Sequence, residues 1–166
     1  PLSWKIYFAQ QNDTSPATIA ELAEDQWQSI SPGSSWQKQG LNHPGRTSNE
    51  KAETIAWYKC KFATPAPQVG QPAWLVIGAV DDLDVTYLNS REIGHTGLET
   101  PEYWQAKRIY PVPSGLLKAD NLLLIRVTDL AGEGGICALP IILTFTAPAS
   151  SNADSGKVFD LPMYTQ

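Results

Sequence analysis

The chain has 166 residues and a formal net charge of −5, with 42% hydrophobic and 17% charged residues, a balance that excludes an intrinsically disordered chain. No run of Lys or Arg could line a phosphate backbone, so we expect no nucleic-acid partner. No window approaches the roughly 18 apolar residues that cross a bilayer, so we expect no direct membrane insertion.

The first predicted elements precede the long strands. Residues 4–8 alternate between apolar and polar side chains, which predicts an opening strand. Residues 15–26 have apolar side chains spaced for one helical face, which predicts a short helix or a single turn. Residues 27–53 are rich in Ser, Pro, Gly and Asn, and predict a long loop that is either ordered and pinned by Trp27 and Trp36 or partly mobile.

Six further strands follow, each bounded by Pro, Gly, Asn or Asp and none separated from the next by a convincing helix. Consecutive strands without crossover helices predict an all-β fold, an antiparallel sandwich or barrel. Leu123, Ile125 and Val127 share one face of their strand, which we expect to be the core face. The predicted strands are residues 55–62, 73–80, 84–88, 107–112, 122–128 and 136–145.

The domain organisation follows from composition. We expect a single β-sandwich domain over residues 1–146 and a linker or C-terminal tail over residues 147–166, whose first part is poor in apolar residues. Residues 158–166 either return to the sheet or belong to a following domain. Because the chain begins at Pro1, we expect a segment excised from a longer parent.

The chain has two cysteines, which cannot make a metal site alone. Cys60 alternates with aromatic residues two positions away on each side, so we expect it to point into the core while Lys59 and Lys61 face water. A buried free thiol is the interpretation that we favour. A disulfide with Cys137 stays open for an exported protein.

A short acidic stretch separates two predicted strands. Asp81, Asp82 and Asp84 resemble the start of a calcium-binding loop, but no bidentate acid closes such a site. We therefore interpret Asp81 and Asp82 as turn formers and expect one of them to pair with Arg126. We expect no metal ion and no cofactor.

Five phrases of the sequence occur together in one known group of domains. They are Trp57-Tyr58-Lys59 with Phe62, residues 77–94, residues 108–113, residues 121–129 and residues 134–136. Together they resemble the galactose-binding-like jelly-roll domain found at the N-terminus of glycoside hydrolase family two enzymes and inserted in sialate O-acetylesterases. The resemblance covers residues 27–145 and implies a sandwich of about eight strands whose loops can meet a sugar. It implies no catalytic residues within the domain.

Two positions depart from the family's pattern. Asn89-Ser90 stands where an Asn-Gly hairpin is usual, and Lys59 stands where an Arg is usual. Serine costs more than glycine in the left-handed conformation, which leaves the type of turn open. Neither change endangers the fold.

The loop of residues 95–106 holds the first candidate ligand-binding residues, because by resemblance it leans toward the sugar site of a partner domain. These candidates are His95, Glu99, Tyr103 and Trp104. An aromatic face can stack on the C–H face of a pyranose, while carboxylates accept hydrogen bonds from its hydroxyl groups. The alternative is that Tyr103 and Trp104 plug the end of the sandwich.

Two further candidates lie outside this loop. Asp129 precedes a glycine-rich loop whose backbone can approach a ligand closely, although a strained turn between strands requires the same glycines and is the use that we favour. Trp36 is the tryptophan that we expect to be exposed, as a second stacking platform. Trp57 and Trp74 lie inside strands and are expected to be buried.

For catalysis the sequence offers little. It has no Gly-x-Ser-x-Gly elbow and no His-Glu-x-x-His pattern. A glycosidase would need two carboxylates, for instance Glu99 and Asp129, facing each other about 5 to 10 Å apart. In the resembling enzymes the catalytic acids lie in a separate barrel that this chain does not contain, so we expect no enzyme here.

The function that we expect is a non-catalytic carbohydrate-binding or ligand-sensing module of a larger exported or membrane-anchored protein. Its partners would be a carbohydrate or another small polar ligand and a neighbouring domain of the same parent chain, in the periplasm or outside the cell. The alternative is a structural domain that docks against a catalytic or signalling domain. That alternative predicts an exposed apolar patch outside the loops.

Overall fold

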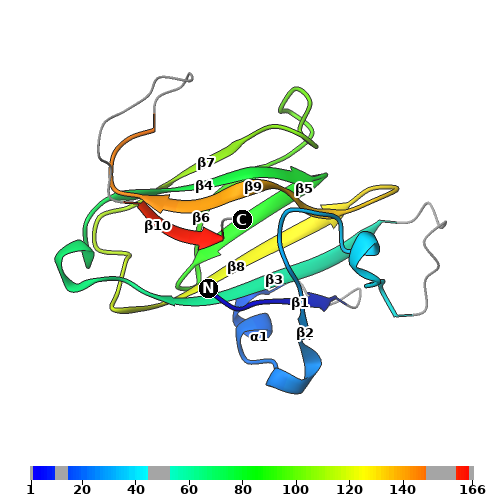
Figure 1. The fold of residues 1–166 in the computed structure, drawn as a ribbon, viewed down its shortest axis with the longest axis horizontal. Coiled ribbons are helices and arrows are strands. Elements are labelled where there is room, and N and C mark those ends of the chain that lie inside the picture. The colour runs from blue at the N-terminus through cyan, green and yellow to red at the C-terminus, as the bar shows by residue number, and fades with distance from the viewer. Residues whose placement is uncertain (1, 10–14, 45–52, 149–159, 165–166) are drawn as a thin grey trace.

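Two antiparallel sheets pack face to face in the computed structural model (Figure 1). The structure describes residues 2–9, 15–44, 53–148 and 160–164. In these parts, one sheet has six strands in the order β2-β1-β3-β8-β5-β6 and the other has four in the order β10-β9-β4-β7. The expected all-β antiparallel sandwich is confirmed.

The bounds of the strands are as follows. The six-stranded sheet consists of β1 (Trp4–Phe8), β2 (Gln28–Ser29), β3 (Thr54–Ala63), β5 (Leu83–Leu88), β6 (Arg91–Thr96) and β8 (Asp120–Asp129). The four-stranded sheet consists of β4 (Ala73–Asp81), β7 (Arg108–Val112), β9 (Gly135–Thr144) and β10 (Asp160–Tyr164). The short helices are α1 (Pro16–Ala20) and the 3₁₀ helices η1 (Glu24–Gln26), η2 (Gln37–Gln39) and η3 (Ala66–Gln68). No helix in the described ranges is long and apolar enough to cross a membrane.

The predicted strands agree with the observed ones to within two residues at each end. The predicted strands do not include β2 or β6, and the predicted helical segment is divided between α1 and η1. Of the two alternatives for the last residues of the chain, the structure has the return to the sheet, because β10 pairs with β9.

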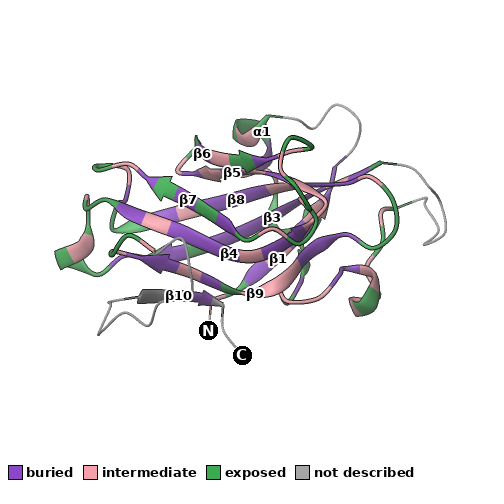
Figure 2. Cartoon of the chain, turned by 90° about the horizontal axis from the view of Figure 1, so that it is seen from above, coloured by how far each residue is buried: buried purple, intermediate pink, exposed green. Residues whose placement is uncertain are grey.

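The core lies between the two sheets and follows the alternation of the strands. Leu123, Ile125 and Val127 point into it as expected, and Figure 2 shows buried residues gathered along the strands of both sheets. Cys60 is fully buried in this core and has a free thiol, which confirms the interpretation that we favoured. Cys137 is half-buried and also free, so the two cysteines form no disulfide.

A second apolar cluster covers part of the outer face of the six-stranded sheet. The segment that contains α1 contributes Ile19 and Trp27, which pack on Trp57 of β3 and Leu124 of β8. This cover corrects one expectation, because Lys59 is buried and does not face water. Its Nζ lies 2.8 Å from Glu24 and 4.2 Å from the centroid of the Trp27 ring.

Two tryptophans differ from the sequence prediction. Trp36 is only 1% exposed, because residues 33–44 fold across the end of the sandwich and carry its ring inward, 5.5 Å from the ring of Phe8. Gly134 allows this packing, since a Cβ there would lie 2.5 Å from the Trp36 ring. Trp36 is therefore no stacking platform. Trp57 is buried as expected, whereas Trp74 is only half-buried.

The turn at Asn89-Ser90 connects β5 and β6. Both residues have positive φ, +50° at Asn89 and +69° at Ser90. Positive φ at both central residues is typical of a type I′ hairpin. The serine therefore keeps the hairpin conformation in which Asn-Gly is usual.

Candidate ligand-binding site

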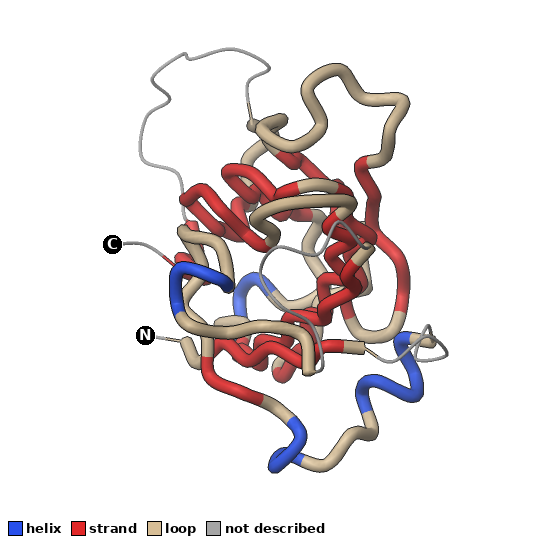
Figure 3. The backbone as a smooth tube through the Cα atoms, turned by 90° about the vertical axis from the view of Figure 1, so that its right-hand side faces the viewer, coloured by secondary structure: helices blue, strands red, loops and turns tan. Residues whose placement is uncertain are grey.

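Four segments meet at one end of the sandwich, which we name the loop end: residues 33–44, 81–82, 97–107 and 130–134. This end lies on the right in Figure 1, and in Figure 3 it faces the viewer. All six predicted site residues lie in these segments or in the strand residues next to them. Their environments differ, so they do not form one site.

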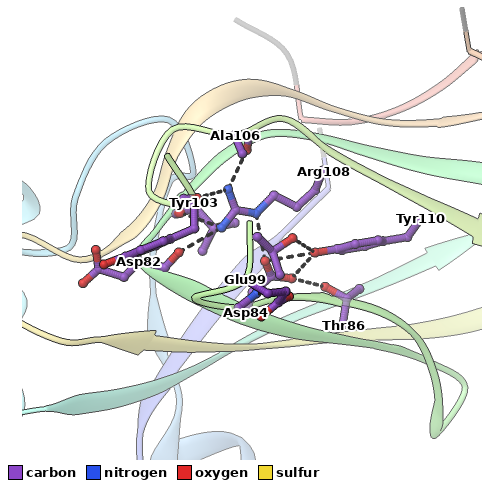
Figure 4. Close-up of polar contacts among 11 residues, drawn as sticks. Asp82, Asp84, Thr86, Glu99, Tyr103, Ala106, Arg108 and Tyr110 are labelled. Carbon is purple, nitrogen blue, oxygen red and sulfur yellow. Dashed lines mark hydrogen bonds and ion pairs between the residues drawn. The ribbon is translucent and has the colours of Figure 1, made fainter. Parts of the chain in front are cut away.

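A fully buried arginine organises the loop end (Figure 4). The Nε of Arg108 donates to Asp84 Oδ1 at 2.8 Å, and Nη1 donates to the carbonyls of Tyr103 and Ala106 at 2.6 and 2.5 Å. Nη2 donates to the carbonyls of Val80 and Asp82, both at 2.9 Å. All five N–H groups of the guanidinium are thus used, and they tie residues 103–106 to the turn that follows β4.

The carboxylate of Asp84 is the other half of this network. It accepts hydrogen bonds from the hydroxyl of Tyr110 at 2.9 Å and from that of Thr86 at 2.9 Å. Burial and the adjacent carboxylate raise the pKa of Tyr110, so its hydroxyl stays protonated and can donate. The network is buried and closed, and it serves to position the loop rather than to bind a ligand.

This network corrects the prediction that Asp81 or Asp82 pairs with Arg126. The observed ion pair joins Asp84 and Arg108, whereas Arg126 lies on the outer face of the six-stranded sheet. Asp81 and Asp82 do form the turn between β4 and β5, and Asp82 Oδ2 accepts the N–H of Leu130 at 2.8 Å. One signal could have indicated the pair: Arg108 and Asp84 each occupy the core-facing position of an alternating strand.

The loop of residues 97–107 exposes two large apolar side chains. Trp104 is 45% exposed and Leu98 is 66% exposed. The ring of Tyr103 stands perpendicular to that of Trp104 at a centroid distance of 5.3 Å, and Tyr103 itself is half-buried. Of the two interpretations of Trp104, plug and platform, its exposure favours the platform.

The polar candidates of the same region already have partners. Glu99 Oε1 accepts the N–H of Gly97 at 3.0 Å, and backbone hydrogen bonds lower the pKa of Glu99. His95 is exposed, its Nδ1 lies 2.8 Å from Glu92 Oε1, and this contact raises the pKa of His95. Both side chains remain exposed, so a ligand can still reach their free atoms.

Asp129 has a different environment from the other candidates. It is only 3% exposed, and its Oδ1 has no hydrogen-bond partner among the described residues. Burial and the nearby Asp82 raise the pKa of Asp129 to about 6, and burial together with Asp82 raises the pKa of Asp81 to about 7. In the described ranges no three His, Cys, Asp or Glu side chains are arranged to hold a metal ion.

A pocket of about 700 Å³ lies at the opposite end of the sandwich, between the end of β3 and the hairpin at Asn89-Ser90. Asn89 and Asn121 line it, but the amide of Asn89 donates to Asn121 Oδ1 at 2.9 Å, and both side chains also bind backbone groups. These hydrogen bonds fix the position of the hairpin. None of the predicted site residues lines this pocket.

No family model and no curated protein matches this chain. Among solved structures it is similar to the β-glucuronidase of Ruminococcus gnavus, with a TM-score of 0.58 and 19% identity over 76% of this chain and 20% of that chain. It is also similar to the β-glucuronidase of Faecalibacterium prausnitzii, with a TM-score of 0.55 and 20% identity over 75% of this chain and 19% of that chain. A glycosyl hydrolase family 2 member from Bacteroides cellulosilyticus gives a TM-score of 0.59 and 17% identity over 81% of this chain and 18% of that chain.

These likenesses establish the fold. The expectation of a galactose-binding-like jelly roll of the kind found in glycoside hydrolase family 2 is confirmed. The chain spans about a fifth of the length of each of these proteins. Fold alone does not fix function, which has to be argued from the loop end.

Proposed function

We propose that this chain is a non-catalytic carbohydrate-binding module and that Trp104 is its stacking surface. The observation that supports this most strongly is the exposure of the Trp104 indole on a loop whose backbone the buried Arg108 holds. Exposed tryptophans on a fixed backbone are well suited to stack on the C–H face of a sugar ring.

The anchoring of the loop matters for affinity. Tyr103 and Ala106 flank the indole along the chain, and their carbonyls are fixed by Arg108. A ligand that meets a preorganised loop has less conformational entropy to remove on binding. One shallow aromatic surface still supplies little energy, so we expect dissociation constants in the millimolar range, about −4 kcal/mol.

The neighbouring polar groups suit hydroxyl recognition. Glu99 and the His95–Glu92 pair are exposed on the residues that lead into the loop, and they offer both hydrogen-bond acceptors and donors. The proposal that the module does not itself hydrolyse a sugar rests on the environments of Glu99 and Asp129. Glu99 is exposed and folded against its own loop, whereas Asp129 is buried.

The comparisons support a glycoside hydrolase as the parent protein. Two of the similar structures are β-glucuronidases and a third is a family 2 glycosyl hydrolase, and each is about five times as long as the part that this chain covers. We therefore propose that the chain is an accessory domain of a glycoside hydrolase. An exported or membrane-anchored parent is part of this proposal.

A second candidate function, docking against a neighbouring domain, is favoured by a separate observation. Ile109 of β7 is exposed on the outer face of the four-stranded sheet, where Pro111 next to it pairs with the half-buried Trp74 of β4. Such an apolar sheet face is typical of a surface that another domain covers.

Affinity measurements with variants separate the two functions. The chain and its Trp104→Ala, Trp104→Phe and Leu98→Ala variants would be titrated at high concentration against a panel of neutral oligosaccharides. Carbohydrate binding predicts that Trp104→Ala abolishes binding, that Trp104→Phe retains part of it, and that Leu98→Ala stays within about twofold of the wild type.

Ile109→Ala is the matched control for docking. It removes an exposed apolar side chain outside the loop and should leave sugar affinity unchanged. If no oligosaccharide binds the wild type, the carbohydrate proposal is wrong and docking becomes the better account. Thermal unfolding of each variant would show that the substitutions leave the fold intact.

A further inference from the structure

The outer face of the six-stranded sheet carries a row of side chains, of which the proposed sugar site uses only His95 and its partner Glu92. The register pairs Arg126 of β8 with Trp57 of β3 on one side and with Val85 of β5 on the other, and Val85 pairs with His95 of β6. In the neighbouring row, Leu124 of β8 pairs with Tyr87 of β5, and Tyr87 pairs with Glu92 of β6. Since Ile125 and Val127 point into the core, Arg126 points outward.

The described residues cover only part of this face. The cluster around Trp27 packs over β3 and part of β8, whereas β5 and β6 lie toward the far edge of the sheet. Here Arg126, Val85 and Tyr87 are half-buried, and His95 and Glu92 are exposed. We name these five residues the Arg126 platform.

Arg126 has unused hydrogen-bond donors. Its Nη1 donates to Thr128 Oγ1 at 3.2 Å, whereas its Nε is buried and has no partner among the described residues, and the guanidinium forms no ion pair with any of them. The chain has 17 acidic residues, and in the described ranges none of them pairs with this guanidinium. The buried Nε is out of a ligand's reach, so the donors left for a ligand are the remaining terminal N–H groups, which can pair with the oxygens of a carboxylate or a phosphate.

The neighbours of Arg126 favour a ring-shaped ligand. The Tyr87 ring is backed by Trp57 at a centroid distance of 5.9 Å and an interplanar angle of 33°, which holds it in place at the edge of the cluster. Glu92 Oε1 lies 2.8 Å from His95 Nδ1, so a protonated His95 would offset the charge of Glu92 next to an incoming anion. Tyr87 and Val85 supply apolar contact beside the guanidinium.

We propose that the Arg126 platform binds the carboxylate of an acidic saccharide, with Arg126 on the carboxylate and the Tyr87 ring against the sugar. This site shares only the His95–Glu92 pair with the proposed site at the Trp104 loop, and its contact with the carboxylate does not depend on Trp104. A chain with a net charge of −5 repels acidic ligands at long range, so the proposal requires the specific contact with Arg126.

The test is an NMR and affinity titration of the whole chain with trigalacturonic acid and with its methyl ester. The proposal predicts that the acid shifts the Nε–Hε signal of Arg126 and that the ester, which lacks the charge, binds about tenfold more weakly. Arg126→Gln should lower the affinity for the acid about tenfold, and Arg126→Lys should restore only part of it, because lysine keeps the charge but loses the fork.

Two controls keep the result specific. Arg91→Gln removes an exposed arginine from β6 and should leave the affinity within about twofold, and Trp104→Ala should do the same because Trp104 belongs to the other site.

Equal binding by Arg126→Gln and the wild type, or no shift at Arg126, would overturn the proposal. Equal binding of a hexaglutamate peptide would overturn the assignment to a saccharide. Thermal unfolding would confirm that each variant is folded.

Discussion

At the scale of single residues, the loop end depends on one buried ion pair. Arg108 and Asp84 are both removed from solvent, and the carbonyls around Arg108 take up its remaining donors. Desolvation makes such a pair costly, so its value lies in the geometry that it imposes rather than in net stability. The geometry that it imposes here is the position of the loop that carries Trp104.

Arg108→Ala should therefore lower the free energy of unfolding by about 3–5 kcal/mol, because it leaves the Asp84 carboxylate buried without its charge partner. It should also release residues 103–106 and weaken any binding at Trp104. Urea denaturation measures the first effect. Arg91→Ala, an exposed arginine, is the control and should change stability by about 0.5 kcal/mol or less. Equal stability of Arg108→Ala and the wild type would contradict this role.

The buried carboxyl groups at the loop end predict an unusual pH dependence. The folded-state pKa values of Asp129 and Asp81, about 6 and about 7, lie above the ordinary value of 3.8. Folding therefore takes up protons between these values, and the stabilisation present below about pH 4 is lost as the pH rises through 6 to 7. The melting temperature should fall between pH 5 and pH 8.

Variants identify the groups responsible for this change. His95 also has a raised pKa, from its contact with Glu92, and contributes in the same direction. Asp129→Asn and Asp81→Asn should each flatten the decline in melting temperature, and His95→Gln should remove only a smaller part of it. A melting temperature that rises from pH 5 to pH 8 would show that the two aspartates do not take up protons on folding.

At the scale of elements, the strands that the sequence predicted correctly are those with a clear pattern of apolar residues. The core strands β3, β4, β8 and β9 are long and rich in apolar residues, so their existence follows from the pattern. The edge strand β6 has Ile93 as its one large apolar residue, because its outer face meets water, and the same pattern misses it. The burial of Lys59 could not be predicted, since it depends on a segment distant in sequence that folds over the sheet.

That covering segment gives a prediction of its own. Trp27 packs on Trp57 and Leu124 and lies over the Lys59 ammonium group. Trp27→Ala should lower the free energy of unfolding by about 3–5 kcal/mol, because it opens a cavity and leaves Lys59 without its aromatic cover. Leu98→Ala, at an exposed position, should cost about 0.5 kcal/mol or less in the same urea measurement. Similar losses for both variants would mean that the segment contributes little.

At the scale of the whole molecule, the sandwich brings loops from distant parts of the sequence to one end. The sequence indicated the fold and the loop that carries Trp104, because strands and their connections have local patterns. It did not indicate that Trp36 and Asp129 are buried, since Trp36 packs near Gly134 and Asp129 pairs with Thr54 of β3, both distant in sequence. The pair of Arg108 and Asp84 was missed because, although each occupies a core-facing strand position, their contact forms only when the two sheets pack.

The measurement that tests the central claim most directly is the indole N–H signal of Trp104 during titration with neutral oligosaccharides. If Trp104 is the stacking surface of a carbohydrate-binding module, this signal should shift in a saturable way, and the indole signals of the buried Trp36 and Trp57 should not. An unchanged Trp104 signal at ligand concentrations of tens of millimolar, about tenfold above the expected dissociation constant, would contradict the claim.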